Sequence, residues 1–425
     1  MSQLSFGGLL AVAVIALLAP LLVSLAPKAR IPADVVAIVA GIVVGPSVLG
    51  WVQIDTPITV LSLLGLAFLL FLAGLELDLD RLRGPLLRLA VTGFAISVGI
   101  GVVAGLTFHA LGYVRSPFLL AVALSATSLG LVVPILKDAG QLEADLGQLT
   151  VAGASVADFG AVLLLSFFFS ESSGKASTKI VLIGGLAVLV VVVAMTLSRL
   201  NMSMGLDALL TRLQDTTAEI RVRIAIVLLV AFVAVAQKIG LEAILGAFLA
   251  GAILAAADKK TMSHPHFRAK LEAIGYGFLV PVFFVASGIR FDLKALTHSP
   301  SAFARVPLFL IALLLVRGLP AALYRPRVGR RGAAAAGLLQ ATSLPFLVTA
   351  VQIGLATDKI SAATGAALIF AGLLSVVIFP VSALTLLGRS QHPTAPETGA
   401  TSDMLARIRP ELPDRDPPRA APQRG

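Results

Sequence analysis

A succession of long apolar segments constrains the fold of this chain more than any other feature. Segments of roughly 17–25 mainly apolar residues suffice to cross a bilayer as helices, and thirteen of them follow one another here. The chain is 57% hydrophobic and 13% charged, whereas soluble domains carry about 25% charged residues. The pattern therefore predicts an all-α membrane protein. The segments centre near residues 6–25, 32–50, 58–76, 87–111, 117–137, 147–169, 179–198, 221–239, 241–257, 273–290, 302–324, 332–354 and 361–387.

The composition excludes several classes of site. The chain has no cysteine, so disulfides and thiolate metal sites are excluded. Its net charge of +10 could suggest nucleic-acid binding, but the basic residues lie in short loops between apolar segments. That distribution is a topology signal for a protein in a lipid bilayer. We expect no nucleic-acid partner, no cofactor and no resident metal.

The loops predict an orientation in the membrane. Loops on one side hold 18 Lys and Arg and those on the other side hold 8, and the richer side should be cytoplasmic. The N-terminus is then outside and the C-terminus inside, with a multi-pass location in the plasma membrane. One basic residue is left over: Arg317 lies deep inside the apolar segment Leu308–Gly318.

We predict two parts along the chain. Residues 1–388 form a transmembrane domain, in which 199–220 link two halves along the cytoplasmic face. Residues 389–425 are rich in Pro, Arg and Ala and are typical of a disordered cytoplasmic tail. We expect no nucleotide-binding domain, because no strand with a glycine-rich turn follows the apolar segments.

The two halves, about residues 31–170 and 241–388, show an internal repeat. Leu124–Leu129 (Leu-Ser-Ala-Thr-Ser-Leu) reappears as Leu339–Leu344 (Leu-Gln-Ala-Thr-Ser-Leu), an offset of 215. Two weaker matches occur earlier in each half, and the three matches have the same order in both halves. Because equivalent segments are seven apart, the two copies face opposite ways. Inverted repeats with a site at their midplane interface are common in secondary transporters. The weaker matches join Phe71–Leu79 to Val285–Leu293 (offset 214) and Val35–Gly45 to Ala243–Gly251 (offset 210).

The duplicated Ala-Thr-Ser-Leu segments predict two discontinuous helices. Ser and Thr can satisfy backbone groups that are freed where a membrane helix is broken. Two such breaks crossing at mid-depth would place helix-dipole ends beside a bound ion. The alternative is ordinary hydrogen bonding of these hydroxyls to the preceding turn of intact helices. The polar residues concerned are Thr127, Ser128, Thr342 and Ser343.

An acid inside an apolar segment is the principal candidate for transport chemistry. Asp158 lies within residues 148–169, where a carboxylate costs roughly 2.5–3.5 kcal/mol on insertion scales. Such residues usually mark ion or proton pathways. A carboxylate can hold either a proton or a small cation, so the two can compete for it. The alternative is a structural salt bridge between Asp158 and Arg317.

Other polar and small residues favour structural interpretations. Glu76 ends the third segment, so a solvated helix end is expected there, as it is for Asp78. Asp34 begins a segment, where an acid suits the helix N-terminus. The glycine spacings in the second and ninth segments suit close helix packing.

These segments together resemble the monovalent cation:proton antiporter-2 family, of the sodium/hydrogen exchanger and glutathione-gated potassium efflux type. The resemblance covers roughly residues 6–388. It implies thirteen helices, two crossed discontinuous helices, a dimerisation domain, a homodimer and an elevator-like alternation. The family's acid maps onto Asp158, its buried basic residue onto Arg317, and its broken-helix polar residues onto Thr127, Ser128, Thr342 and Ser343. The resembling parts are Gly41–Gly50, Phe68–Leu77, Leu245–Gly251 and Pro281–Gly288.

The chain departs from the family pattern at one place. Ala157 precedes Asp158 where the family commonly has Asp or Asn, so the second acid of electrogenic members is absent. We therefore expect electroneutral exchange of one Na⁺ or K⁺ for one H⁺, with the choice of cation left open. Two alternatives remain: a sodium-coupled organic-solute symporter of similar crossed-helix plan, and a channel-like or sensory homologue that does not exchange ions.

Overall fold

The described part of the chain is built from helices. The computed structural model describes residues 6–25, 32–76, 84–169, 176–201, 219–257, 265–297 and 299–387, and no strand occurs among them. The predicted linker falls largely outside these ranges, as do Asp78 and the predicted tail. Contacts divide the chain into two units, Met1–Leu387 and Gly388–Gly425. The helices are α1 (Phe6–Leu25), α2 (Ala33–Val44), α3 (Thr56–Leu75), α4 (Gly84–Ala110), α5 (Pro117–Ser125), α6 (Leu129–Asp138), α7 (Asp145–Phe169), α8 (Ala176–Asn201), α10 (Ile220–Lys238), α11 (Ala243–Ala257), α12 (Pro265–Ile274), the π-helix Gly275–Leu279, α13 (Val280–Ile289), α14 (Leu293–Thr297), α15 (Pro300–Gly318), the 3₁₀-helix Leu319–Tyr324, α16 (Arg325–Gln340), α17 (Pro345–Ala356) and α18 (Ala362–Leu387).

The apolar segments predicted from the sequence coincide with these helices. By length and composition, nine helical stretches of the described residues could cross a membrane, and four shorter apolar helices accompany them. Several begin with a Pro in the first turn, where its missing N–H costs nothing. The Asp55 carboxylate and the Ser116 hydroxyl each accept a hydrogen bond from the first turn, of α3 and α5 respectively.

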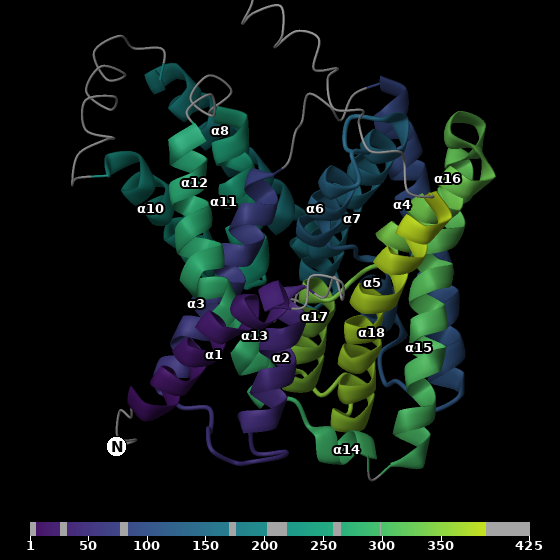
Figure 1. The fold of residues 1–425 in the computed structure, drawn as a ribbon. Coiled ribbons are helices and arrows are strands. Elements are labelled where there is room, and N and C mark those ends of the chain that lie inside the picture. Colours follow the sequence, from purple (N-terminus) through teal and green to yellow (C-terminus); the bar gives the residue numbers. More distant parts are fainter. Residues whose placement is uncertain are drawn as a thin grey trace, which may run out of the picture. The chain divides into compact units, whose positions relative to one another are not determined.

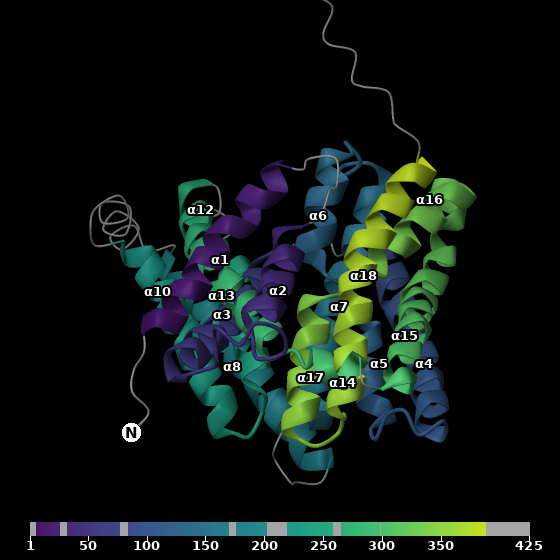
Figure 2. The same cartoon turned by 60° about the horizontal axis from the view of Figure 1, so that its bottom comes forward.

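The helices form two groups that lie side by side (Figure 1). One group contains α1–α3, α8 and α10–α13, in which α3 packs on α11 and α2 packs on α13. The other contains α4–α7 and α15–α18, in which α4 packs on α5 and α15 packs on α18. The view in Figure 2 shows the same separation from another side. The groups meet where α7 contacts α11.

Two helices of the second group are interrupted where the repeat predicted. Helix α5 ends at Ser125 and α6 starts at Leu129, with extended backbone at Ala126 and Ser128 between them. Helix α16 ends at Gln340 and α17 starts at Pro345. The Ser128 N–H donates to the Thr342 carbonyl oxygen at 3.1 Å, so the two breaks touch. The crossed discontinuous helices are confirmed.

Close glycine contacts join α3 to α11 in the first group. A Cβ added to Gly74 would collide with the carbonyl oxygen of Phe248. One added to Gly251 would collide with the carbonyl oxygen of Phe71. The two backbones therefore approach to a distance that only glycine permits, as small-residue packing of membrane helices requires.

The same contact recurs between α2 and α13. A Cβ on Gly41 would collide with the carbonyl oxygen of Val285, and one on Gly288 with that of Ile38. Each of these positions corresponds to one of the α3–α11 contact, at the offset of 210 or 214 found in the sequence. The contact is therefore duplicated with its partners exchanged, as an inverted repeat requires. Gly41 and Gly251 act in packing, as predicted, and Gly74 and Gly288 act in the same way.

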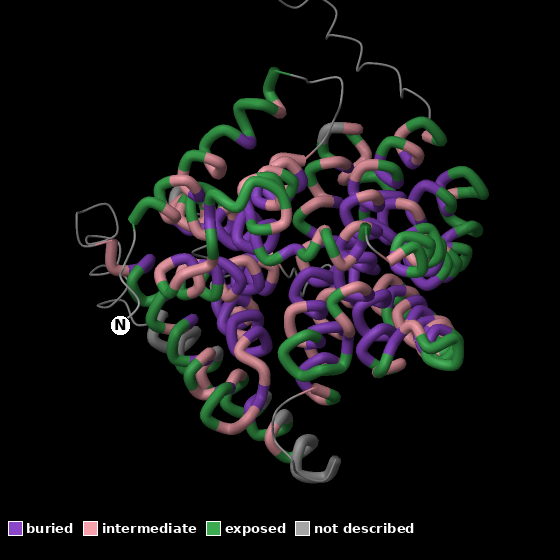
Figure 3. Tube along the Cα trace, turned by 90° about the horizontal axis from the view of Figure 1, so that it is seen from below, coloured by how far each residue is buried: buried purple, intermediate pink, exposed green. Residues whose placement is uncertain are grey.

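Burial differs between the helices (Figure 3). Helix α1 is green and pink over much of its length, and within it only Val12 and Ala19 are buried. In contrast, every residue from Leu119 to Ser125 of α5 is buried. Exposed apolar side chains suit a surface that faces lipid. Helix α5 therefore lies in the interior.

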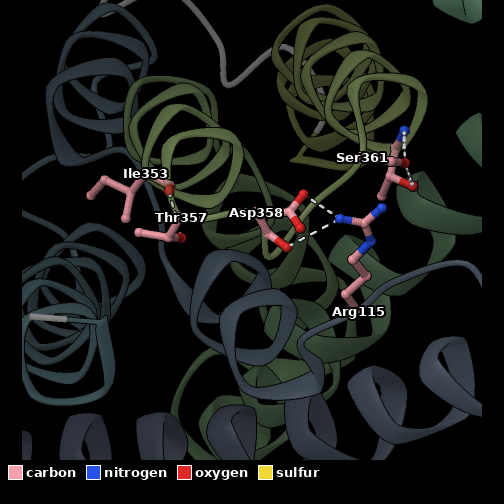
Figure 4. Close-up of polar contacts among 6 residues, drawn as sticks. Arg115, Ile353, Thr357, Asp358 and Ser361 are labelled. Carbon is pink, nitrogen blue, oxygen red and sulfur yellow. Dashed lines mark hydrogen bonds and ion pairs between the residues drawn. The ribbon is translucent and has the colours of Figure 1, made fainter. Parts of the chain in front are cut away.

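The loops that flank the two discontinuous helices are joined by an ion pair (Figure 4). Arg115 precedes α5, and its guanidinium reaches the carboxylate and the carbonyl oxygen of Asp358, which follows α17. Asp358 adopts a positive φ of 53°. The side chains are 57% and 87% exposed, so the pair contributes little to stability.

Candidate functional site

Asp158 lies on α7 opposite the break between α5 and α6. Its Oδ2 accepts a hydrogen bond of 3.1 Å from the backbone N–H of Leu129, the first residue of α6. That N–H is one of the groups that a helix start leaves without a partner, and the positive end of the helix dipole favours a carboxylate there. Its Oδ1 is buried and has no hydrogen-bond partner among the described residues. One carboxylate oxygen is therefore held and the other is free.

A cavity of about 70 Å³ opens beside this carboxylate. Its wall is formed by α2, α3, α11, the π-helix and α13 from one group of helices and by the α5–α6 break, α7 and α17 from the other. The walls are mostly apolar, with leucine, valine and phenylalanine side chains. The polar lining residues are Asp34, Glu76, Thr127, Ser128, Asp158 and Tyr276. The predicted ion-binding residues Asp158, Thr127 and Ser128 thus share one cavity.

Arg317, at the end of α15, is the largest side chain in the described structure that is fully buried. Its Nε donates to the Thr127 hydroxyl at 2.7 Å, and Nη1 donates to the Ser97 hydroxyl at 3.1 Å. Its Nη2 donates to the Gly153 carbonyl oxygen at 3.3 Å and to Gln340 Oε1 at 3.5 Å. Arg317 therefore ties α4, α7, α16 and the first break together.

The predicted partnership of Arg317 with Asp158 takes an indirect form. Among the described residues, no ion pair within 4.0 Å joins them. The structural salt bridge considered from the sequence is therefore absent. Arg317 holds Thr127, whose hydroxyl donates in turn to the Gln340 carbonyl oxygen at 2.8 Å. Its guanidinium fixes the break beside Asp158 instead of neutralising the acid directly.

The polar residues of the second break lie apart from the cavity wall. The Thr342 hydroxyl donates to the Leu338 carbonyl oxygen at 3.3 Å, within its own helix. The Ser343 N–H donates to the Ser375 hydroxyl at 3.3 Å, and the Ser343 hydroxyl is buried without a hydrogen-bond partner in the described structure. Thr342 and Ser343 therefore belong to the second break, and the cavity is lined by the polar residues of the first break.

The interpretation of Glu76 as a solvated helix end is wrong. Its side chain is 19% exposed and lines the same cavity as Asp158. Glu76 follows the last residue of the α3 span, and burial raises the pKa of its carboxyl to about 7. Arg268 lowers this pKa and Glu272 raises it, and both effects are smaller than that of burial. The sequence places Glu76 at a helix end but does not show that this end lines a cavity or lies near Arg268.

Sequence reasoning also missed Gln340, which is buried. Its side-chain amide N–H donates to the Tyr324 hydroxyl at 3.0 Å. Its Oε1 accepts a hydrogen bond from Arg317, and its backbone carbonyl oxygen accepts one from the Thr127 hydroxyl. A signal was available, because Gln340 stands in the repeated segment where the first copy has Ser125.

As for a resident metal, the described residues contain no group of three or more His, Asp or Glu side chains able to hold one.

Comparison with known proteins decides the family. The model for "Sodium/hydrogen exchanger, transmembrane" matches residues 13–387, which is most of the chain. The chain belongs to the sodium/hydrogen exchanger family. Within this family, it is 30% identical over 418 residues to the putative Na(+)/H(+) antiporter YjbQ of Bacillus subtilis, covering 94% of this chain and 66% of that protein. This chain thus spans slightly less than two thirds of that relative.

Two further comparisons agree with this membership. The chain is 31% identical over 291 residues to a Na(+)/H(+) antiporter of Enterococcus hirae, covering 67% of this chain and 72% of that protein. Its fold is similar to that of the sodium proton antiporter MjNhaP1 from Methanocaldococcus jannaschii, with a TM-score of 0.66 at 18% identity. That match covers 89% of this chain and 98% of the other. The exchanger fold and the multi-pass membrane architecture of this family member are therefore established.

Proposed function

We propose that this chain exchanges a monovalent cation, Na⁺ or K⁺, for H⁺ across the membrane. The supporting observation is the state of the Asp158 carboxylate, with Oδ2 bound to the Leu129 N–H and Oδ1 buried without a protein partner among the described residues. A buried polar atom without a partner is costly. A proton on Oδ1, or a cation beside it, would neutralise the buried charge of this carboxylate. The relatives named as Na(+)/H(+) antiporters support the same activity.

The proposed mechanism is competition of the two ions for one carboxylate. Asp158 carries either a proton or a cation across the membrane, and the occupied site then has the same net charge on both legs. Ser128 lies beside Asp158 on the cavity wall and offers a hydroxyl oxygen to the cation. Thr127 contributes less through its hydroxyl, which already accepts from Arg317 and donates to Gln340. With Ala157 preceding Asp158, we expect electroneutral exchange of one cation for one proton.

We also propose a location and an assembly state. The Lys and Arg distribution favours the plasma membrane with the N-terminus outside and the C-terminus cytoplasmic. In that orientation the part of the cavity wall formed by Glu76 and Asp34 lies toward the cytoplasm. A homodimer is expected from the family resemblance, and α1 offers a largely exposed apolar surface for lipid or a second copy. Cross-linking of the purified protein in liposomes would test the dimer.

A salt-jump experiment tests the proposed exchange. Purified protein is reconstituted into liposomes that contain a pH-sensitive dye, and NaCl, KCl, LiCl or choline chloride is added outside. We expect proton efflux on addition of at least one alkali cation and none with choline. An imposed membrane potential should change the rate little, because exchange of one cation for one proton moves no net charge.

Three results would contradict the proposal in different ways. Proton movement that requires an added organic solute would indicate the symporter alternative. Cation flux without proton countertransport would indicate a channel. A steep dependence on membrane potential would leave exchange intact but refute the stoichiometry.

A further inference from the structure

A second carboxylate lies in the cavity of Asp158. Glu76 follows α3 and lines this cavity with Asp34, Tyr276 and Asp158. Its Oε1 lies 3.7 Å from Nη2 of Arg268, which comes from α12. That separation is longer than a charge-assisted hydrogen bond, which measures about 2.7–2.9 Å. Glu76 is therefore paired with Arg268 only loosely.

Arg268 has a closer partner. Its Nε lies 2.7 Å from Oε1 of Glu272, one turn along α12. A single guanidinium thus serves two carboxylates, so the three side chains together carry one net negative charge when both acids are ionised. Asp34, on the same cavity wall, adds a further acid. The excess negative charge lies where a cation passing through the cavity would meet it.

The repeat shows that packing does not demand an acid at this position. The matched segments align Glu76 with Arg290, which occupies the corresponding end of α13 in the second half. The Arg290 guanidinium reaches the hydroxyls of Ser62 and Thr59 at 3.3 and 3.5 Å. The same helix end therefore accommodates an acid in one half and a base in the other. The backbone of this helix end therefore does not fix the sign of the charge that it carries.

We propose that Glu76 is a second cation-binding carboxylate in the Asp158 cavity, and that Arg268 occupies it when no metal cation does. An incoming Na⁺ or K⁺ displaces Arg268, which remains bound to Glu272, and then passes from Glu76 to Asp158. Arg268 thereby sets the cation concentration at which the cavity fills. This inference rests on the proposed cation exchange and adds a binding residue to it.

The two members of the pair then have opposite effects, which a purely structural ion pair would not have. Loss of Glu76 removes a ligand and weakens cation binding. Loss of Arg268 removes a competitor and strengthens it. A structural pair, by contrast, loses the same interaction whichever partner is replaced. The direction of the change in apparent affinity therefore separates the two roles.

Protonation of Glu76 determines the conditions for the test. The charged and titratable groups around it are Arg268 and Glu272 of α12, Asp34 of α2, Tyr276 of the π-helix and Asp158 of α7. Burial raises the pKa of Glu76 to about 7, so the carboxylate is mostly ionised above pH 8 and mostly neutral below pH 6. Measurements at about pH 8.5 compare ionised Glu76 in all variants.

The experiment measures cation binding and transport on the same proteins. Binding of NaCl, KCl and LiCl to purified protein is followed by calorimetry at constant ionic strength with choline chloride, and the apparent KM is measured in liposomes. We expect Glu76→Gln to raise the Kd and KM about tenfold with little change in maximal rate, and Arg268→Gln to lower both about threefold. The double variant should resemble Glu76→Gln, because Arg268 then has no site to block.

A matched control uses another ion pair of α12. Lys270 Nζ lies 2.8 Å from Oε1 of Glu219, outside the residues that line the cavity. Glu219→Gln should leave the Kd and KM unchanged. A tenfold loss in this variant as well would show that disturbing α12 is sufficient, and would overturn the role of Glu76.

The pH profile gives a third readout with a definite sign. Cation affinity should fall as pH decreases through about 7 and Glu76 takes up a proton. Arg268→Gln should move this fall to higher pH, because the nearby positive charge lowers the pKa of Glu76. If Glu76→Gln binds cations as the wild type does, or if both single variants change the Kd in the same direction, the inference is overturned. Absence of proton transport in the wild type would instead overturn the exchange itself.

Discussion

The two halves of the repeat share a backbone plan but differ in the group that holds each break. In the first half the Asp158 carboxylate accepts from Leu129 N–H, at the start of α6. In the second half the Ser375 hydroxyl of α18 accepts from the Ser343 N–H at 3.3 Å, and Ser343 is the residue that matches Ser128 in the repeat. A carboxylate can exchange a proton for a cation near neutral pH, whereas a hydroxyl cannot. The comparison indicates that the fold is duplicated while the proposed chemistry belongs to one half.

The prediction with the largest effect compares these two residues directly. Asp158→Asn keeps the size of the side chain but removes the group that binds a proton or a cation. We expect it to abolish cation-dependent proton movement in liposomes. Ser375→Ala removes only neutral hydrogen bonds, each worth about 0.5–1.5 kcal/mol, and should retain exchange within a factor of about three. Equal losses of transport in the two variants, measured on monodisperse proteins, would contradict the assignment of the chemistry to one half.

A second prediction concerns Arg317, which also distinguishes the halves. Helix α15 provides this arginine, whereas its repeat partner α4 provides Ser97 to the same network. Arg317→Met would leave the acceptors at Thr127, Gly153 and Gln340 without their charged donor. Losing such a donor from a buried network costs about 3 kcal/mol.

The loss should appear as a lower free energy of unfolding in SDS titrations of the protein in mixed micelles. Arg305→Met on the same helix is the matched control, because Arg305 lies toward the opposite end of α15 and donates to the hydroxyls of Ser301 in α15 and Thr364 in α18. A smaller loss in Arg317→Met than in Arg305→Met would refute the role given to Arg317 at the first break.

The sequence predicted the fold more fully than the site because the two depend on different information. Apolar segment lengths and the duplicated Ala-Thr-Ser-Leu segments are local, and they located the spans and both breaks within a few residues. The partner of Arg317 depends on how α15 is rotated about its axis and how far it lies from α7. Neither quantity follows from a count of spans, so the contact with Thr127 in place of Asp158 could not be foreseen.

Glu76 shows the same limit in another form. Its position at the end of the third apolar segment was evident, but Tyr276, which lines the same cavity, and Arg268, its ion-pair partner, come from a distant part of the chain. The duplicated segment carried a usable hint, since Glu76 aligns with Arg290. The roles of Asp158, Thr127, Ser128, Arg317, Thr342 and Ser343 stay predictions that the experiments above address.

The prediction with the smallest effect concerns the glycine contacts. It tests the helix packing that the two halves share and not the charged groups in which they differ. Gly74→Ala would push a methyl group into the carbonyl oxygen of Phe248, and Gly288→Ala would push one into that of Ile38. Because the two contacts are equivalent in the repeat, we expect similar losses of about 2 kcal/mol in unfolding free energy. Gly99→Ala on α4 is the control, since its Cβ would meet nothing within 4 Å. Alanine favours a helix by about 1 kcal/mol over glycine, so this control should be neutral or stabilising. Similar losses of unfolding free energy in the two variants would show that both halves depend on the same close helix crossing, although their charged groups differ. A large loss in only one half would show that the asymmetry extends from the polar groups to the packing itself.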